Sequence, residues 1–129
     1  MFRHLVLGTD DIERARIFYD ATFAAMGIAP AQADAKGRLL YRDGGGLFIV
    51  GHPIDGQPAS HANGGTVGFL APTPEAVKAW HAAGLAHGGQ ACEGEPENRI
   101  SPATGGGIWV AYLRDPDGNK LCAAWDEPQ

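Results

Sequence analysis

The amino-acid sequence predicts an α+β domain made of two copies of a β-α-β-β-β module. The chain resembles itself when residue 67 is aligned with residue 5, which places one apolar strand on another and Gly27 on Gly89. After each of these strands, apolar residues return at helical spacing. Near the end of the chain, residues 113–121 indicate a strand, a tight turn and a second strand. Together these observations give the order β-α-β-β-β twice.

In the first module, a short strand over residues 5–7 leads into a helix. Asp10 is the expected N-cap, with Glu13 at the capping-box position, and Gly27 can end the helix. Later strands are predicted over 38–41 and 47–50 with a hairpin turn at 43–46, and a weaker strand near 28–35. The apolar face of the helix comprises Ile12, Ala15, Tyr19, Thr22, Phe23 and Met26.

The second module follows the same plan. Thr73 is the expected N-cap and Pro74 occupies the first helical position, where its missing N–H costs nothing. The helix packs through Val77, Trp80, Ala83 and Gly84 and ends before Gly88-Gly89. Strands are predicted over 108–113 and 120–124, with a weaker one near 90–95.

The turn at residues 115–119 has the chemistry of a β-hairpin connection. Pro116 fixes φ, Asp115 can accept hydrogen bonds from the turn amides, and Gly118 can adopt the left-handed conformation. The turn therefore predicts pairing of the last two strands.

The chain length indicates one domain, residues 1–129, with modules at 1–55 and 64–129. A module of about 60 residues buries too little surface to be stable alone, so the two should share a core. Glycine and proline concentrate in the connections, including the linker between the modules.

Composition excludes several classes of partner. The net charge is −5 and no Lys or Arg cluster interrupts it, which argues against nucleic acid and anionic membranes. Asp10 and Asp11 cut short the only early apolar run, so no targeting signal is expected and the predicted location is cytoplasmic. Cys92 and Cys122 are too few for a disulfide framework and are expected to be reduced.

The paired modules, the turn at 115–119, and His4-Leu5-Val6-Leu7 leading to Phe18-Tyr19 resemble the vicinal oxygen chelate superfamily. This superfamily includes glyoxalase I, extradiol dioxygenases, and bleomycin- and fosfomycin-resistance proteins. The resemblance implies a half-open, cupped β-sheet, a site in its concavity and often a homodimer. It does not identify a substrate, because these motifs are packing features.

The resemblance also implies four metal-ligand positions, which fall on His4, Ile49, Thr66 and Cys122. Only His4 and Cys122 could coordinate a metal, fewer than the three protein ligands typical of catalytic zinc. The metal site therefore looks degenerate, and no cofactor is expected. A divalent metal held through His4 remains the alternative, with His52 and His61 of the linker as replacement ligands or as solvated loop histidines.

Six residues are candidates for ligand binding. Trp109 and Tyr112 lie on one strand with opposite facing, so one of them should point into the concavity, unless both serve only packing. Arg99, in a loop over 95–102, could form part of a lid that meets a carboxylate or phosphate, or could simply face solvent. A Cys122–His4 pair could act as a nucleophile, although a buried structural cysteine is the plainer interpretation. The candidates are His4, Thr66, Trp109, Tyr112, Cys122 and Arg99.

Three functions are therefore compatible with the sequence. The first is metal-free binding of a small organic molecule. The second is a glyoxalase-like, metal-dependent lyase, isomerase or dioxygenase acting on a small oxygenated substrate. The third is a structural partner whose concavity forms a dimer interface.

Overall fold

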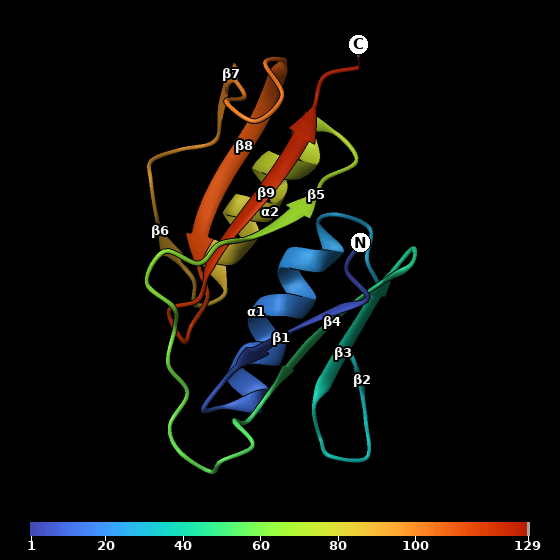
Figure 1. Ribbon diagram of the computed structural model, residues 1–129, viewed down its shortest axis with the longest axis vertical. Helices are drawn as coiled ribbons and strands as arrows, with labels where there is room; N and C mark the ends of the chain where they lie inside the picture. The colour runs from blue at the N-terminus through green and yellow to red at the C-terminus, as the bar shows by residue number, and fades with distance from the viewer. Residues whose placement is uncertain (129) are drawn as a thin grey trace.

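The structure, a computed structural model, describes residues 1–128 and contains two successive β-α-β-β-β series (Figure 1). The first comprises β1 (His4–Gly8), α1 (Ile12–Ala24), β2 (Gln32–Ala33), β3 (Leu39–Asp43) and β4 (Gly46–Gly51). The second comprises β5 (Val67–Leu70), α2 (Pro74–Ala86), β6 (Gln90–Ala91), β7 (Glu97–Ile100), β8 (Gly107–Arg114) and β9 (Lys120–Asp126). The predicted order is confirmed, and β7 is an addition to it.

Each module forms its own open sheet with the same plan. The strand orders are β1-β4-β3-β2 and β5-β9-β8-β6, and β7 also pairs with β8. In both sheets the first strand lies at the edge and runs parallel to the last strand of its module. The two edge strands, β1 and β5, approach each other where the modules meet (Figure 1).

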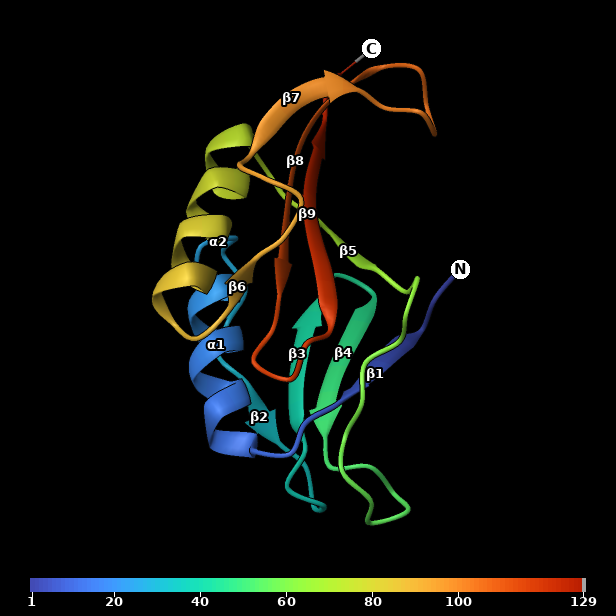
Figure 2. The ribbon, with the colours of Figure 1, turned by 90° about the vertical axis from the view of Figure 1, so that its left-hand side faces the viewer.

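The two helices pack side by side on one side of the molecule, and both sheets lie on the other (Figure 2). This arrangement leaves the opposite side of each sheet, here called the open face, without a covering helix. Within residues 1–128, neither helix is long and apolar enough to cross a membrane.

The helix caps confirm one prediction and correct another. Thr73 accepts a hydrogen bond from the Ala76 amide and Pro74 begins α2, as expected. In α1, however, the N-cap is Asp11 and not Asp10. Asp10 instead accepts a hydrogen bond of 2.6 Å from the backbone N–H of Ala59 in the linker. This contact engages the Asp10 side chain and leaves Asp11 to cap the helix.

The hydrophobic core is continuous between the modules. Phe69 on β5 packs edge-on against Phe23 of α1 and Phe48 of β4, at ring-centroid distances of 5.0 and 5.2 Å. A Cβ at Gly84 of α2 would lie 3.3 Å from Phe18 and 3.4 Å from Thr22 of α1, so the two helices approach closely here. The modules are therefore held together by shared aromatic packing and close helix contact, as their small size predicts.

The predicted lid loop around Arg99 is wrong. Residues 97–100 form β7, which pairs with β8 from Glu97↔Val110 to Ile100↔Gly107. β6 pairs with a more distant part of the same strand, and the chain between them contains Glu93 at φ 55° and Gly94 at φ 84°. The irregular connections are thus residues 92–96 and 101–106, with a strand between them.

Candidate functional site

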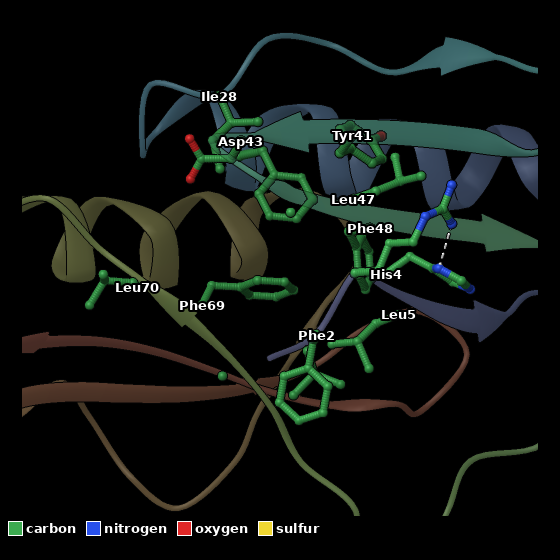
Figure 3. Close-up of a pocket in the computed structure, with 15 residues that line it drawn as sticks. Phe2, His4, Leu5, Ile28, Tyr41, Asp43, Leu47, Phe48, Phe69 and Leu70 are labelled. Atoms are coloured by element: carbon green, nitrogen blue, oxygen red, sulfur yellow. Dashed lines mark hydrogen bonds between the residues drawn. The ribbon is translucent and has the colours of Figure 1, made fainter.

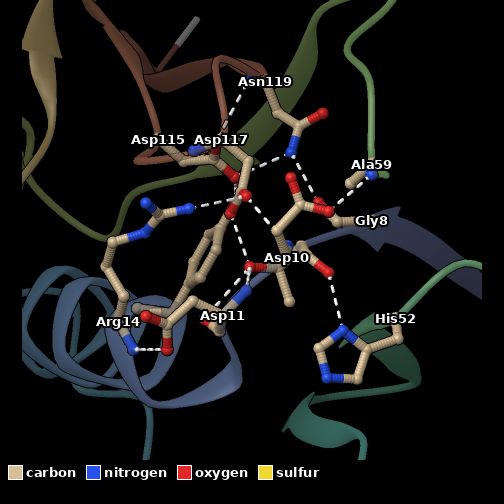
Figure 4. A network of polar contacts seen from close by, with 11 residues as sticks. Gly8, Asp10, Asp11, Arg14, His52, Ala59, Asp115, Asp117 and Asn119 are labelled. Carbon is tan, nitrogen blue, oxygen red and sulfur yellow. Dashed lines mark hydrogen bonds and ion pairs between the residues drawn. The ribbon is translucent and has the colours of Figure 1, made fainter. Parts of the chain in front are cut away.

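A polar network between the modules fixes how their strands meet (Figure 4). The phenol of Tyr19 donates a 2.5 Å hydrogen bond to the carboxylate of Asp115, which also accepts from the backbone amides of Asp117 and Asn119. Asn119 in turn donates to the carbonyl of Gly8 at the end of β1. The turn predicted from residues 115–119 therefore serves as the docking point of the second module on the first.

Asp117 makes the second half of this network. Its carboxylate accepts hydrogen bonds from the Thr9 hydroxyl at 2.6 Å and the Asp10 amide at 3.0 Å, and it forms an ion pair with Arg14 at 2.8 Å. Because these partners lie directly after β1, the network holds the β1 to α1 connection in place (Figure 4).

An apolar pocket of about 190 Å³ opens where β1 and β5 meet, and we call it the seam pocket (Figure 3). Its floor is aromatic: Phe23, Phe48 and Phe69 contact one another in edge-to-face geometry. A pocket with apolar walls and few polar groups is the usual form of a small-molecule site. Its lining residues are Phe2, Arg3, His4, Leu5, Phe23, Ile28, Tyr41, Asp43, Gly46, Leu47, Phe48, Val67, Gly68, Phe69 and Leu70.

Charged and polar side chains lie near the mouth of the seam pocket. His4 lies at one end, where Arg3 and the His4 Nδ1 atom are 2.8 Å apart, and the carboxylate of Asp43 lies at another (Figure 3). The pocket therefore offers a ring-sized apolar hollow with hydrogen-bonding groups of both charges near its mouth.

The four positions implied for a metal do not provide a ligand set within one chain. His4 lines the seam pocket, whereas Ile49, Thr66 and Cys122 do not. No three His, Cys, Asp or Glu side chains among residues 1–128 gather closely enough to hold a metal ion. With an isoleucine and a neutral hydroxyl at two of the positions, the residues present do not fit the metal site of metal-dependent relatives.

Tyr112, Cys122 and Arg99 form a polar cluster on the open face of the second sheet. Tyr112 pairs with Cys122 in the β8–β9 ladder, and its hydroxyl accepts a 2.9 Å hydrogen bond from Arg99. The Lys120 ammonium lies 5.1 Å from the centre of the same ring, at cation–π distance. Arg99 and Lys120 are each also paired with a glutamate, Glu97 and Glu93 respectively.

The environment of Cys122 argues against a nucleophile. Burial raises the pKa of its thiol to about 11, against the lowering effects of Arg99 and of a hydrogen bond from Tyr112. The His4 ring contacts Arg3 instead, and the alternative Cys122–His4 pair is not formed within the described chain, which agrees with the interpretation of Cys122 as a buried structural cysteine. Cys122 is thus a protonated, largely buried thiol, and Cys92 is also free.

Trp109 and Tyr112 face opposite sides of their sheet, as their spacing predicts. Trp109 packs on the helix side, where the Lys78 ammonium of α2 lies 4.3 Å from the ring centre. Tyr112 therefore is the one of the two that lies on the open face. Thr66 precedes β5 and lines neither the seam pocket nor the linker pocket described below.

The linker histidines are engaged away from His4. The Nδ1 atom of His52 lies 3.0 Å from the carbonyl oxygen of Thr9 (Figure 4). His61 packs so closely on Gly118 that a Cβ there would lie 2.7 Å from its Nδ1 atom. Neither histidine lines the seam pocket, so neither replaces the missing ligands there.

Sequence reasoning identifies His4 but misses the rest of the seam pocket. The apolar patterns place Phe23 on a helix face, Phe48 in a strand and Phe69 in the first strand of the second module, without bringing them together. The sequence offers one signal, the apolar residues Phe2 near the chain end and Leu70 at the end of a strand. In the structure each of these side chains is 75% exposed beside the pocket. Their convergence depends on the contact between modules, which the sequence does not encode locally.

The comparisons with known proteins agree with this architecture. A family model described as Glyoxalase/Bleomycin resistance protein/Dioxygenase superfamily matches residues 2–123. A crystal structure of a glyoxalase/bleomycin resistance protein from Albidiferax ferrireducens T118 is 48% identical, with a TM-score of 0.92 over 97% of this chain and 98% of that one. No curated protein matches the chain.

More distant structures share only the fold. A glyoxalase-related enzyme from Fulvimarina pelagi is 21% identical, with a TM-score of 0.70 over 97% of this chain and 87% of that one. A lactoylglutathione lyase from Agrobacterium tumefaciens is 22% identical, with a TM-score of 0.64 over 97% and 92% of the two chains. The family match over nearly the whole length, together with the 48% identical structure, shows that this chain belongs to the glyoxalase/bleomycin resistance protein/dioxygenase superfamily.

Proposed function

We propose that the protein binds, without a metal, a small organic molecule whose aromatic ring enters the seam pocket. The observation that carries this proposal is the floor of the pocket, where Phe23, Phe48 and Phe69 from both modules present faces and edges to one open hollow. Edge-to-face contacts with such rings add to the free energy gained from burial, which favours an aromatic guest over an aliphatic one.

The polar cluster on the open face supplies a second anchor for the same ligand. Gly68 lines the seam pocket, pairs with Cys122 on the next strand, and Cys122 pairs with Tyr112 on the strand after that. Two strand spacings amount to about 10 Å. A Cβ at Gly68 would meet nothing within 4 Å, so the path from the pocket toward Tyr112 is not blocked at this residue. We therefore propose a ligand with a carboxylate about 10 Å from its ring, held by Arg99.

A matched pair of ligands tests this proposal directly. 7-Phenylheptanoate and 7-phenylheptanol share a ring and a chain long enough to cross the two strand spacings, but they differ in charge, and both can be titrated by calorimetry. We expect the acid to bind more tightly than the alcohol. Arg99→Gln should remove this difference in affinity, whereas Arg42→Gln, which loses the same charge on β3, should keep it. A ligand present at a hundred times its Kd adds about 2.7 kcal/mol to the free energy of unfolding and so raises the melting temperature. If neither compound nor any member of a broader aromatic screen raises it, the proposed function is wrong.

Elemental analysis separates this function from the metal-dependent alternative. Protein purified without chelator should contain less than about a tenth of an equivalent of transition metal, since the donor set supplies too few ligands. A full equivalent of metal, with lyase, isomerase or dioxygenase activity that returns on reconstitution, would replace the proposed binding function.

We further propose that the protein is a homodimer in which the open faces are shielded. Val6 on β1 and Leu70 on β5 point to the open faces and are 50% and 75% exposed, so a partner copy placed there would remove apolar surface from water. Light scattering during gel filtration tests this proposal, and a monomer at micromolar concentration would exclude it.

We also propose a cytoplasmic location, supported by the two free thiols, a state that reducing compartments maintain. Cell fractionation with an antibody against the protein tests the location.

A further inference from the structure

A second hollow lies beneath the linker, at the carboxyl ends of β1 and β4, and we call it the linker pocket. Its volume is about 490 Å³. It is separated from the seam pocket by the length of the strands: His4 and Leu47 line the seam pocket, whereas Gly8 and Gly51 line this one, about 13 Å away along each strand. The linker pocket plays no part in the function proposed above.

Hydrogen bonds on both sides hold the wall of the linker pocket in place. The His52 ring contacts the carbonyl of Thr9 at 3.0 Å, and the Ala59 amide donates to Asp10 at 2.6 Å. Between these anchors, Pro53 and Pro58 restrict the backbone. The wall is therefore a built part of the fold and not a loosely placed loop.

Two glycines allow the parts of the pocket to approach closely. A Cβ at Gly8 would lie 3.2 Å from the Ala59 Cβ, and a Cβ at Gly51 would lie 2.7 Å from the Arg38 Cγ. The Arg38 side chain thus runs directly over the end of β4. Any larger residue at position 51 would displace this side chain.

Arg38 is fixed with part of its guanidinium left available. Asp34 accepts hydrogen bonds from the Arg38 amide at 3.0 Å and from its Nε atom at 2.7 Å, so one edge of the guanidinium is occupied. Within residues 1–128, neither Nη atom has a hydrogen-bond partner, and the Lys36 ammonium has no ion pair. An oriented guanidinium beside a lysine is a favourable arrangement for an oxyanion such as phosphate.

The remaining groups around the pocket define the rest of the ligand. Asp55 is the one carboxylate that lines it within the described chain, and one of its oxygens accepts from the Gln57 amide. Val6, Leu7, Ile12, Pro53, Ile54 and Pro58 supply apolar wall. The lining thus carries two cations, Lys36 and Arg38, against the one carboxylate of Asp55, while Arg38 is also paired with Asp34.

We infer that the linker pocket binds an organic phosphate monoester, with the phosphate at Lys36 and Arg38 and a short apolar group against β1 and the prolines. A phosphate can pair with the Lys36 ammonium and accept hydrogen bonds from the free Nη atoms of Arg38, and the apolar group fills the volume that a bare phosphate would leave to water.

The test is a titration of the full-length protein followed by amide NMR shifts, with three probes. n-Butyl phosphate carries both head group and tail, inorganic phosphate the head group alone, and n-butanol the tail alone. We expect saturable shifts at Gly8, Gly51 and His52, tightest for n-butyl phosphate and weakened by added salt. Lys36→Gln and Arg38→Gln should each weaken binding by roughly tenfold.

Two further variants keep this test decisive. Arg42→Gln removes the same charge from β3, outside the pocket, and should leave the affinity nearly unchanged. Asp55→Asn keeps the acceptor for the Gln57 amide but removes the opposing charge, so it should tighten binding. No saturable shift at these amides, or an equal loss in Arg42→Gln, overturns the inference; neither result bears on the ring-binding test at the seam pocket.

Discussion

The phenol of Tyr19, in the middle of α1, donates a hydrogen bond of 2.5 Å to Asp115, which opens the turn between β8 and β9. Both residues are almost fully buried. Burial raises the pKa of the Asp115 carboxyl, while the donors Tyr19 and Asn119 act in the opposite direction. The contact therefore ties a helix of one module to the turn of the other through a group that cannot be left unpaired without cost.

Replacing Tyr19 with phenylalanine should expose that cost. The ring can keep its stacking with Phe23, but Asp115 loses one donor in a buried environment. We expect the free energy of unfolding to fall by about 1–3 kcal/mol, the usual cost of leaving a buried polar group without one of its hydrogen-bond partners. Urea denaturation monitored by tryptophan fluorescence measures it.

Tyr41→Phe is the matched control. The Tyr41 phenol donates to Asp20 at 2.7 Å, but that carboxylate is only partly buried and can recruit water. Its loss should cost clearly less than that of Tyr19. Equal effects of the two substitutions would mean that the inter-module contact has no special energetic role.

Features of the fold that depend on local chemistry could be predicted from the sequence. Thr73 and Pro74 define the start of α2 by themselves, and α1 and α2 begin at residues 12 and 74, the same shift that aligns residue 5 with residue 67. Asp115 and Gly118 form their turn as expected, with Gly118 at φ 91°. Each of these features needs only residues a few positions apart.

Features that depend on contacts between distant segments could not be predicted. Residues 97–100 lack the alternation of a strand, and β7 forms because the edge of β8 is available for pairing. The choice of Asp11 over Asp10 as N-cap depends on the Ala59 amide, far along the chain. The seam pocket likewise exists only because Phe69 of one module meets Phe23 of the other.

Gly84→Ala should destabilise the protein although alanine favours helices. A Cβ at this position would overlap Leu113 Cδ1 and lie 3.3 Å from Phe18 Cε2, so side chains at the junction of α1, α2 and β8 must move. We expect a loss of about 1–3 kcal/mol from overpacking, opposite in sign to the helix-propensity gain of about 1 kcal/mol. Thermal unfolding of Gly84→Ala beside the wild type decides the sign, and a higher melting temperature would contradict the close packing.

The two cysteines should differ in reactivity. Because burial raises the pKa of Cys122 to about 11, only about one thiol in a thousand is ionised at pH 8. Cys92 is more exposed and should react first with iodoacetamide, as intact-protein and peptide mass spectrometry would show. Rapid labelling of Cys122 at pH 8 under native conditions would contradict the assigned environment.

The same pKa gives a stability effect at alkaline pH. The folded chain holds the Cys122 proton more tightly than the unfolded chain, whose thiol has a pKa of about 8.5. The resulting stabilisation is complete below about pH 8.5 and is lost as the pH rises through about 11. The difference in unfolding free energy between wild type and Cys122→Ala should therefore shrink over that window, and a constant difference would be evidence against the raised pKa.

Gly46→Leu should close the seam pocket without harming the fold. Gly46 pairs with Asp43, whose side chain lines the pocket, so a side chain at 46 points to the same face of the sheet. A Cβ there meets only the Asp43 carbonyl, at an ordinary 3.5 Å. We expect binding of 7-phenylheptanol to weaken by at least about tenfold, because the ring and the new isobutyl group compete for one volume.

Gly45→Leu is the control for this substitution. Gly45 lies in the β3–β4 turn and does not line the pocket, and a Cβ at this position would meet nothing within 4 Å. Calorimetry should give wild-type affinity for this variant, while both variants unfold cooperatively near the wild-type temperature. If Gly46→Leu binds the ring as well as Gly45→Leu does, the ligand occupies another part of the molecule, because a leucine side chain at position 46 would take up much of the volume of about 190 Å³ in which the ring should sit.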